Sequence, residues 1–255
     1  MSDEHIWGDW LRKEVELPAR KHFFNLVEVK STGEEVVTSD TRAGDPLNAQ
    51  IRVCRECNHG WMNFIQESAR PILKKLFNSE FLILNRSAQE KLSSWVCMST
   101  MASDYLPRHE HSVVSTDSER YAFMKSATPP TNWRIWVAQC DPYSYPSQWI
   151  RFSFPARIVK NIPRGGHHKV PRPNTQTSGF AINRAYFFAL STASDELLHG
   201  WDWRSYPPAR NFLSQIWPVI TEEVPWGLTT MRGSQIGHIG RAIREWVATL
   251  NKLDS

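Results

Sequence analysis

The stretch at residues 54–63, CRECNHGWMN, constrains the fold more than any other part of the sequence. Two cysteines separated by two residues share one metal ion or one disulfide only if the chain turns tightly between them. The preceding run IRVC reads as a strand. The following run WMNFIQESARPILKKLF has apolar residues near helical spacing, with Pro71 inside it. We therefore predict a strand, a cysteine turn and a helix in direct succession.

The remaining patterns predict an α+β protein. The runs HFFNLVEVK and EEVVTS alternate apolar and polar residues about an STG turn, which predicts a β-hairpin at residues 23–39. Residues 88–106 have the pattern of a helix. From about residue 110, β-type runs such as WRIWVAQC alternate with proline-rich turns. We expect a boundary near residue 86, which separates residues 1–86 from a Trp-rich α+β domain at residues 87–255.

Tryptophan and charge are unevenly distributed. Most of the 12 tryptophans follow residue 90, and packing in a β-rich core is our first interpretation, with stacking on nucleic-acid bases as the alternative. The net charge is +4, yet residues 142–194 contain no Asp or Glu. This stretch is either a solvated positive surface or a phosphate-facing one. In the second case the nucleic-acid-binding residues are Arg151, Arg157, Lys160, Arg164, Lys169 and Arg172.

Export and membrane signals are absent from the sequence. No apolar h-region follows a basic N-terminus, and no 18-residue apolar run is present, so we expect a cytoplasmic protein without a membrane partner. In a reducing compartment a Cys-x-x-Cys motif indicates metal binding or thiol redox chemistry. The redox interpretation is disfavoured because redox motifs of this kind normally lie in a βαβ series, which the sequence does not predict.

The order of two motifs carries a family resemblance. An acid–His pair in EHIWGDWL precedes VCRECNHGWMN, and together they resemble the HNH (His-Me finger) endonucleases over about residues 3–70. The resemblance implies an N-terminal ββα-metal module with a zinc-knuckle-like CxxC and an inserted hairpin within residues 1–86. It implies a metal-dependent endonuclease that hydrolyses phosphodiester bonds in DNA, with RNA as the second choice. The alternative is a nucleic-acid-binding protein that descends from such a nuclease and has lost catalysis.

The resemblance also assigns roles to residues. His5 is the general base, because an imidazole accepts a proton near neutral pH. Glu4 and Asn58 supply oxygen ligands to one Mg²⁺ or Mn²⁺. His59 is an alternative ligand, and Asn48 braces the loop beneath the catalytic histidine. Since neighbouring strand residues point to opposite faces, Glu4 and His5 both reach one ion only where the strand ends or twists.

The resemblance implies a structural Zn²⁺ at Cys54 and Cys57, but this sequence departs from the family pattern at this site. Family members with such a knuckle normally carry a second CxxC upstream of the acid–His pair, which completes a tetrahedral site. Here Met1 precedes Glu4 by three residues. Three explanations stay open: the start of the protein lies upstream of Met1, the knuckle is retained without metal, or remote residues complete the site. The candidate remote ligands are His22, His109, His111 and Cys97.

Overall fold

The structure is a computed structural model of residues 1–255. It describes residues 2–15, 22–29, 35–42, 50–78, 80–105, 113–142, 148–154, 173–200 and 211–233, together with 235, 236, 238, 239, 242 and 245. In chain order the elements are β1 (Ser2–His5), α1 (Trp10–Glu14), β2 (His22–Val29), β3 (Glu35–Arg42), β4 (Gln50–Val53), α2 (Arg55–Cys57), the π-helical segment η2 (Asn58–Met62), α3 (Asn63–Phe77), β5 (Leu82–Asn85), α4 (Arg86–Ser103), α5 (Asp117–Ser126), β6 (Trp133–Cys140), β7 (Gln148–Phe154), β8 (Thr175–Ile182), β9 (Ala185–Thr192), α6 (Asp195–Gly200), β10 (Ser214–Trp217), β11 (Glu223–Trp226) and β12 (Thr230–Met231).

An eight-stranded mixed sheet forms the centre of the molecule. Its strands follow the order β10-β6-β9-β8-β7-β2-β3, and β12 pairs with β6 at the side of this path. The β2–β7 and β12–β6 pairs are parallel, and the other pairs are antiparallel. Two small two-stranded sheets, β1–β4 and β5–β11, lie outside it. Mixed helix and strand content confirms the predicted α+β class.

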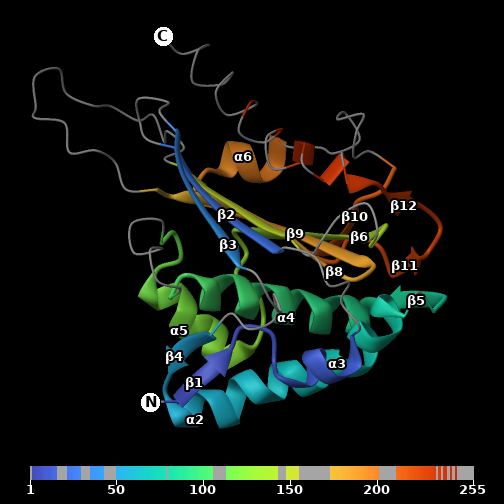
Figure 1. Ribbon diagram of the computed structural model, residues 1–255, viewed down its shortest axis with the longest axis horizontal. Helices are drawn as coiled ribbons and strands as arrows, with labels where there is room; N and C mark the ends of the chain where they lie inside the picture. Colours follow the sequence, from blue (N-terminus) through green and yellow to red (C-terminus); the bar gives the residue numbers. More distant parts are fainter. Residues whose placement is uncertain are drawn as a thin grey trace, which may run out of the picture.

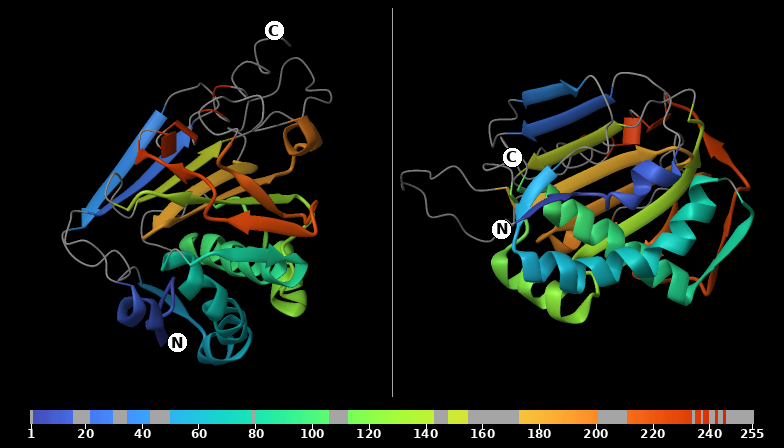
Figure 2. Two further views of the ribbon diagram at one scale, coloured as in Figure 1. Left: turned by 90° about the vertical axis from the view of Figure 1, so that its right-hand side faces the viewer. Right: turned by 60° about the horizontal axis from the view of Figure 1, so that its bottom comes forward.

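The layers are visible in Figure 1. The helix α6 covers one face of the large sheet, and α4 covers the opposite face. The helix α3 packs on the far side of α4, beside the β1–β4 pair, so α4 lies between the sheet and this outer layer (Figures 1 and 2). The β1–β4 pair is therefore attached to the body of the protein through helices.

Along most of its length, the helix α4 is buried on all sides because it lies between the large sheet and the outer layer. Every residue from Leu92 to Ser103 is buried, whereas a helix with one solvent-facing side has only an apolar stripe buried. The Trp95 ring lies 5.4 Å from the Phe187 ring and 5.9 Å from the Phe180 ring, both edge-on. These contacts join α4 to β8 and β9, and edge-on aromatic pairs of this kind stabilise a core.

Several sequence predictions are confirmed. The hairpin predicted at residues 23–39 is formed by β2 and β3, the helix with Pro71 inside it is α3, and the predicted helix at 88–106 is α4. Trp95 and Trp133 are buried, which agrees with the packing interpretation. None of the helices in the described residues is both long enough and apolar enough to span a membrane.

Strand pairing crosses the boundary that the sequence suggests near residue 86. The hairpin β2–β3 extends the large sheet through β7, and β5 pairs with β11. The hydrophobic core likewise includes residues from both sides, among them Leu11 and Phe187. The predicted hairpin is therefore part of the main sheet, although the sequence places it as an insertion in the N-terminal module.

Candidate functional site

The candidate site begins with the two-stranded sheet β1–β4. The strands are antiparallel, with Ser2 opposite Val53 and His5 opposite Gln50. His5 is the last residue of β1, and Gln50 is the first residue of β4. The roles that the resemblance implies for Glu4 and His5 require the strand to end or twist at this pair, and β1 ends at His5. The pairing brings together residues that are 45 positions apart in the sequence.

A direct side-chain contact orients the imidazole of His5. Its Nε2 lies 3.1 Å from Nε2 of Gln50. An amide nitrogen donates and never accepts a hydrogen bond, so Nε2 of His5 is the acceptor in this contact. His5 is half-buried and Gln50 is exposed, so solvent and ligands have access to this pair.

The chain after β1 is anchored on α3 and on the large sheet. Trp7 is buried, and its ring centroid lies 5.9 Å from that of Phe180 on β8. Trp10 Nε1 donates to Oε1 of the buried Gln66 on α3, at 3.3 Å. A Cβ at Gly8 would lie 2.0 Å from the same oxygen and 2.8 Å from the Trp10 ring, so any larger residue there would displace the Gln66–Trp10 hydrogen bond. These contacts fix the position at which β1 ends.

Glu14 adds an electrostatic anchor between α1 and α3. Its Oε1 lies 2.8 Å from Nη2 of Arg70 and 2.7 Å from Nζ of Lys74. The hydrogen bond from Arg70 lowers the pKa of the Glu14 carboxyl, while partial burial opposes this and Lys74 adds to it. The same contact raises the pKa of Arg70. The ionised pair is therefore the favoured form of this contact.

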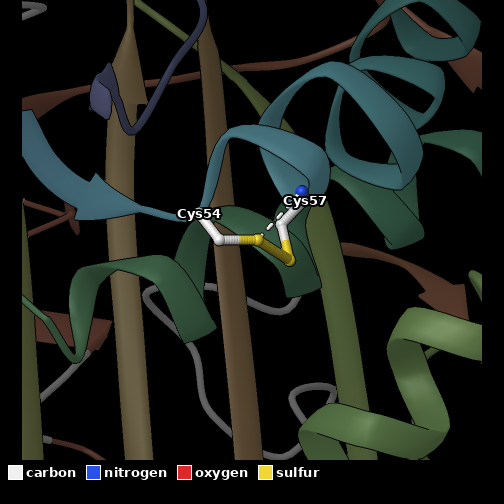
Figure 3. Close-up of a disulfide and its surroundings, with 2 residues drawn as sticks. All are labelled: Cys54 and Cys57. Atoms are coloured by element: carbon white, nitrogen blue, oxygen red, sulfur yellow. Dashed lines mark hydrogen bonds between the residues drawn. A yellow bond between two sulfur atoms is a disulfide. The ribbon is translucent and has the colours of Figure 1, made fainter. Parts of the chain in front are cut away.

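A cysteine turn follows β4 directly. Cys54 is the N-cap of the short helix α2, and its Sγ accepts a hydrogen bond from the Cys57 backbone N–H at 3.0 Å. A disulfide joins Cys54 and Cys57, whose Cα atoms are 5.3 Å apart (Figure 3). The backbone N–H of Asn58 donates to the Cys54 carbonyl at 3.0 Å. The strand, the turn and the helix are thus continuous, as the sequence predicts.

Asn58 opens the segment that leads into α3. It begins η2, in which Gly60 has non-helical torsion angles (φ −93°, ψ −111°) before α3 starts at Asn63. Asn58 is half-buried and His59 is exposed. Both residues follow the cysteine turn directly. The conformation of the turn therefore determines the backbone position of the two predicted metal ligands. The side chain of Glu4 and the whole of Asn48 lie outside the described residues.

The predicted phosphate contact at Arg151 needs correction. Arg151 lies on β7, which has β2 on one side and β8 on the other, and its side chain is 1% exposed. A residue on the covered face of a central strand has no access to an external phosphate. The other predicted contacts, Arg157, Lys160, Arg164, Lys169 and Arg172, lie outside the described residues.

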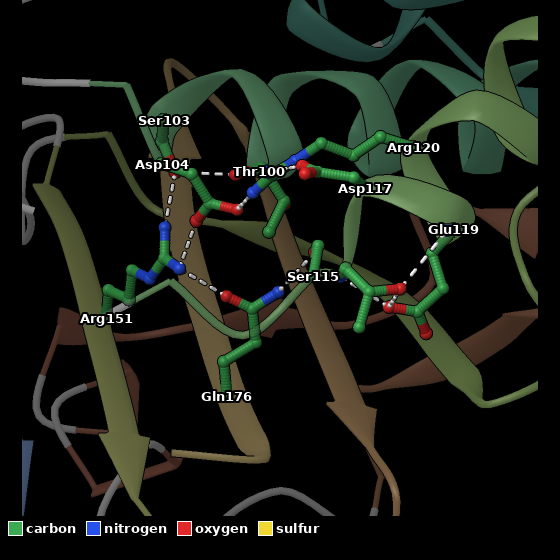
Figure 4. Close-up of polar contacts among 10 residues, drawn as sticks. Thr100, Ser103, Asp104, Ser115, Asp117, Glu119, Arg120, Arg151 and Gln176 are labelled. Atoms are coloured by element: carbon green, nitrogen blue, oxygen red, sulfur yellow. Dashed lines mark hydrogen bonds and ion pairs between the residues drawn. The ribbon is translucent and has the colours of Figure 1, made fainter. Parts of the chain in front are cut away.

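Arg151 belongs to a buried charge cluster that the sequence patterns do not predict (Figure 4). Asp104, at the end of α4, is 0% exposed and forms ion pairs with Arg151 of β7 and Arg120 of α5. Arg151 Nη1 also donates to Ser103 Oγ at 2.9 Å, and its Nη2 donates to Gln176 Oε1 at 2.5 Å. The cluster joins α4, α5, β7 and β8. Its members are far apart in the sequence, so no local signal identifies it.

Metal-binding potential is limited within the described part of the chain. In those residues, no group of three or more His, Cys, Asp and Glu side chains is placed to hold an ion. Cys97, a candidate remote zinc ligand, is buried in α4, and burial raises the pKa of its thiol well above the ordinary value. The side chain of His22 and both His109 and His111 lie outside the described residues. No protein-family model, curated protein or solved structure matches this chain.

Proposed function

We propose that this protein is a metal-dependent endonuclease of the HNH type that cleaves DNA. The observation that carries the proposal is the order and pairing of its elements. An antiparallel strand pair leads through the cysteine turn into a helix, with His5 at the end of the first strand and Asn58 at the start of the helical segment. This arrangement corresponds to the strand–strand–helix order that the resemblance implies.

The chemistry requires a base, a cation and a phosphate in one place. In the proposal, His5 accepts a proton from the attacking water, and one Mg²⁺ or Mn²⁺ offsets the charge that develops on the phosphate. Glu4 and Asn58 provide oxygen ligands, and water and phosphate oxygens fill the remaining positions. Because Glu4 and His5 are adjacent, both are available to one ion at the end of the strand rather than in its middle.

The hydrogen bond between Gln50 and His5 supports the role of the imidazole. In this contact Nε2 of His5 accepts from the Gln50 amide, so the contact orients the ring nitrogen that accepts the proton of water in the proposal. Gln50 is exposed, so a water molecule or substrate is able to replace it at Nε2. We assign Gln50 as a positioning residue that holds the orientation of the His5 ring before substrate binds.

The cysteine turn supports the role of Asn58 through local rigidity. The Asn58 backbone is held by the Cys54 carbonyl, and the two cysteines are joined covalently in this structure. The turn is thus stabilised without zinc. A structural Zn²⁺ at Cys54 and Cys57 stays a prediction of the family resemblance and is not required by the proposed reaction.

A plasmid-nicking assay tests the proposed function. We expect the purified full-length protein to convert supercoiled DNA to nicked or linear DNA with Mg²⁺ or Mn²⁺, and to lose this activity with EDTA. His5→Ala should lower the rate by about 10²–10⁴-fold, because the general base is gone. Asn58→Ala should raise the metal concentration needed for half-maximal rate.

The matched control is His199→Ala. His199 is an exposed histidine on α6, on the other side of the large sheet from the strand pair. We expect this variant to cleave at the wild-type rate. Undiminished cleavage by His5→Ala would refute the assignment of the base. DNA binding without any cleavage by the wild-type protein would favour the non-catalytic alternative.

A further inference from the structure

A second candidate site lies on the inner side of the cysteine turn. A cavity of about 430 Å³ is bounded by β4, the cysteine turn, α4 and α5. Its lining includes an unusual set of sulfur-containing residues: Cys54, Cys57, Met62, Met98, Met101 and Met124. The chain has six methionines and four cysteines, so most of its methionines and half of its cysteines face this one cavity.

The sulfur residues reach the cavity from separate elements. Met62 ends η2, five positions after Cys57, while Met124 lies on α5. Met98 and Met101 are three positions apart on α4 and therefore share a face of that helix. Three of the four methionines are buried. The convergence thus results from the tertiary fold and not from a methionine-rich run of sequence.

Methionine often fills irregular gaps in protein cores, and this is the alternative explanation. Two observations argue for more than gap filling. These side chains, together with aromatic, aliphatic and charged residues, line a cavity of about 430 Å³ rather than filling it. In addition, two cysteines line the same cavity, and Cys54 is exposed while Cys57 is half-buried, so both are accessible from solvent.

We propose that the reduced Cys54–Cys57 pair and the surrounding methionines bind a thiophilic monovalent cation of the Cu(I) type. Thiolate and thioether sulfur are soft ligands that select Cu(I), whereas Mg²⁺ and Mn²⁺ prefer oxygen. A structural Zn²⁺ requires four ligands from Cys, His, Asp or Glu. In the described residues, no group of three or more His, Cys, Asp and Glu side chains is placed to hold an ion. Two thiolates already carry more negative charge than one Cu(I) ion carries positive charge. Further ligands to this ion therefore need no charge, and thioethers are neutral.

Three charged residues belong to the lining of the cavity, namely Arg52, Asp117 and Arg120. Arg120 contributes to the lining, but its guanidinium forms ion pairs with Asp104 and Asp117 and lies 5.1 Å from the centre of the Tyr105 ring. Its positive charge is therefore compensated by carboxylates, and the sulfur atoms remain the chemically distinctive feature of the lining.

Reduction must precede binding, because Cys54 and Cys57 form a disulfide in this structure. Two molecules of a small thiol, RSH, supply two electrons and two protons. The products are two cysteine thiols and one RSSR. Coordination of one Cu(I) by both sulfurs then releases two protons. The site is consequently available under reducing conditions and closed by oxidation.

The other two cysteines provide an internal contrast. Cys97 and Cys140 are buried and free. Desolvation raises the pKa of Cys140 to about 12 and that of Cys97 well above its ordinary value. Both stay protonated at neutral pH and are therefore poor ligands. Cu(I) binding by cysteine thiolates at neutral pH should accordingly depend on Cys54 and Cys57.

A competition titration tests this inference. Full-length protein is reduced with dithiothreitol, desalted without oxygen, and titrated with Cu(I) against a chromophoric Cu(I) chelator. We expect one equivalent to bind, and Cys54→Ser with Cys57→Ser to abolish binding. The double substitution Met98→Leu with Met101→Leu conserves volume and should weaken binding by about 10-fold or more. Met231→Leu, a buried methionine on β12, should leave the affinity unchanged.

Two outcomes would overturn the inference. Wild-type affinity in the Met98/Met101 variant would show that the thioethers are not ligands. Displacement of Cu(I) by equimolar Zn²⁺ would show that the site is not selective for a soft monovalent ion. The inference is independent of nuclease activity, because His5→Ala should bind Cu(I) as the wild type does. Thermal unfolding of each variant separates loss of ligands from loss of the fold.

Discussion

At the end of β1, His5 is half-buried and bonded to the exposed Gln50, whereas in the middle of β7 Arg151 is 1% exposed and bound to Asp104. Both are nitrogen-containing side chains on strands, but their strands occupy different places. β1 belongs to a two-stranded sheet separate from the large sheet, and β7 has a neighbour on each side within the large sheet. The position of a strand in the fold thus determines whether its polar side chains meet solvent or stabilise the interior.

The largest expected effect lies in the buried region. Asp104→Ala removes the carboxylate that Arg151 and Arg120 share, and leaves a buried charge without its partner. We expect a loss of about 3–5 kcal/mol in the free energy of unfolding, measured by urea denaturation. The control is Asp117→Ala, which removes a fully exposed partner of the same Arg120 and should leave the midpoint unchanged. Equal effects of the two substitutions would remove the distinction between the regions.

In the exposed region we expect an effect on rate and not on stability. Gln50→Leu removes the hydrogen bond to His5 Nε2, so the ring loses its preferred orientation. The nicking rate constant kcat should fall by about 10-fold with KM unchanged, because only the geometry of the base is altered. Steady-state kinetics on plasmid DNA measure this split. A rise in KM with constant kcat would instead place Gln50 in substrate binding.

A smaller effect is expected where α1 docks on α3. Glu14 is 21% exposed on its side chain and pairs with Arg70 and Lys74, so Glu14→Gln should cost about 1 kcal/mol at pH 7. The folded pKa of Glu14 is lowered, so its stabilisation is present above the unfolded pKa and lost as the pH falls through the folded pKa. The stability difference between wild type and variant should therefore shrink in acid.

Glu67→Gln is the matched control for Glu14. Glu67 contacts the same Arg70 at 3.4 Å but has a 52% exposed side chain. Its substitution should change the unfolding midpoint less than Glu14→Gln does at pH 7. A difference between wild type and Glu14→Gln that grows in acid would contradict the direction of the pKa shift.

The smallest effect is expected at the surface ion pair between Arg86 and Glu222. The pair joins α4 to the segment before β11, with 2.7 Å between Nη2 and Oε1. Both side chains are exposed, so water screens the attraction. Glu222→Gln should leave the thermal midpoint within experimental scatter. A clear loss of stability would mean that this pair holds the β5–β11 sheet in place.

Local patterns predicted the elements better than their arrangement. Period-two alternation predicted β2 and β3, and helical spacing predicted α3 and α4, because these signals arise within one segment. The pairing of β2 with β7 joins residues more than 120 positions apart, and no pattern within either strand encodes it. The hairpin therefore appeared in the sequence as an insertion, although it extends the main sheet.

The same limit applies to the candidate sites. The strand–turn–helix order around Cys54 was predictable because its parts are contiguous. The burial of Arg151 was not, because it depends on coverage by α4 and on Asp104, which lies 47 positions earlier in the chain. The convergence of methionines on the cysteine turn also needs three helical elements to pack together. A charged or sulfur-containing residue is thus assigned a role only after its neighbours are placed.

The most direct test of the central proposal is a Mn²⁺ titration monitored by NMR of selectively labelled histidine and asparagine side chains. If Asn58 binds the catalytic ion and His5 lies beside it, substoichiometric Mn²⁺ should broaden the signals of both before those of His199. Glu4→Gln should weaken this broadening. Broadening that spares His5, or that affects His199 equally, would contradict the proposed metal site and with it the nuclease function.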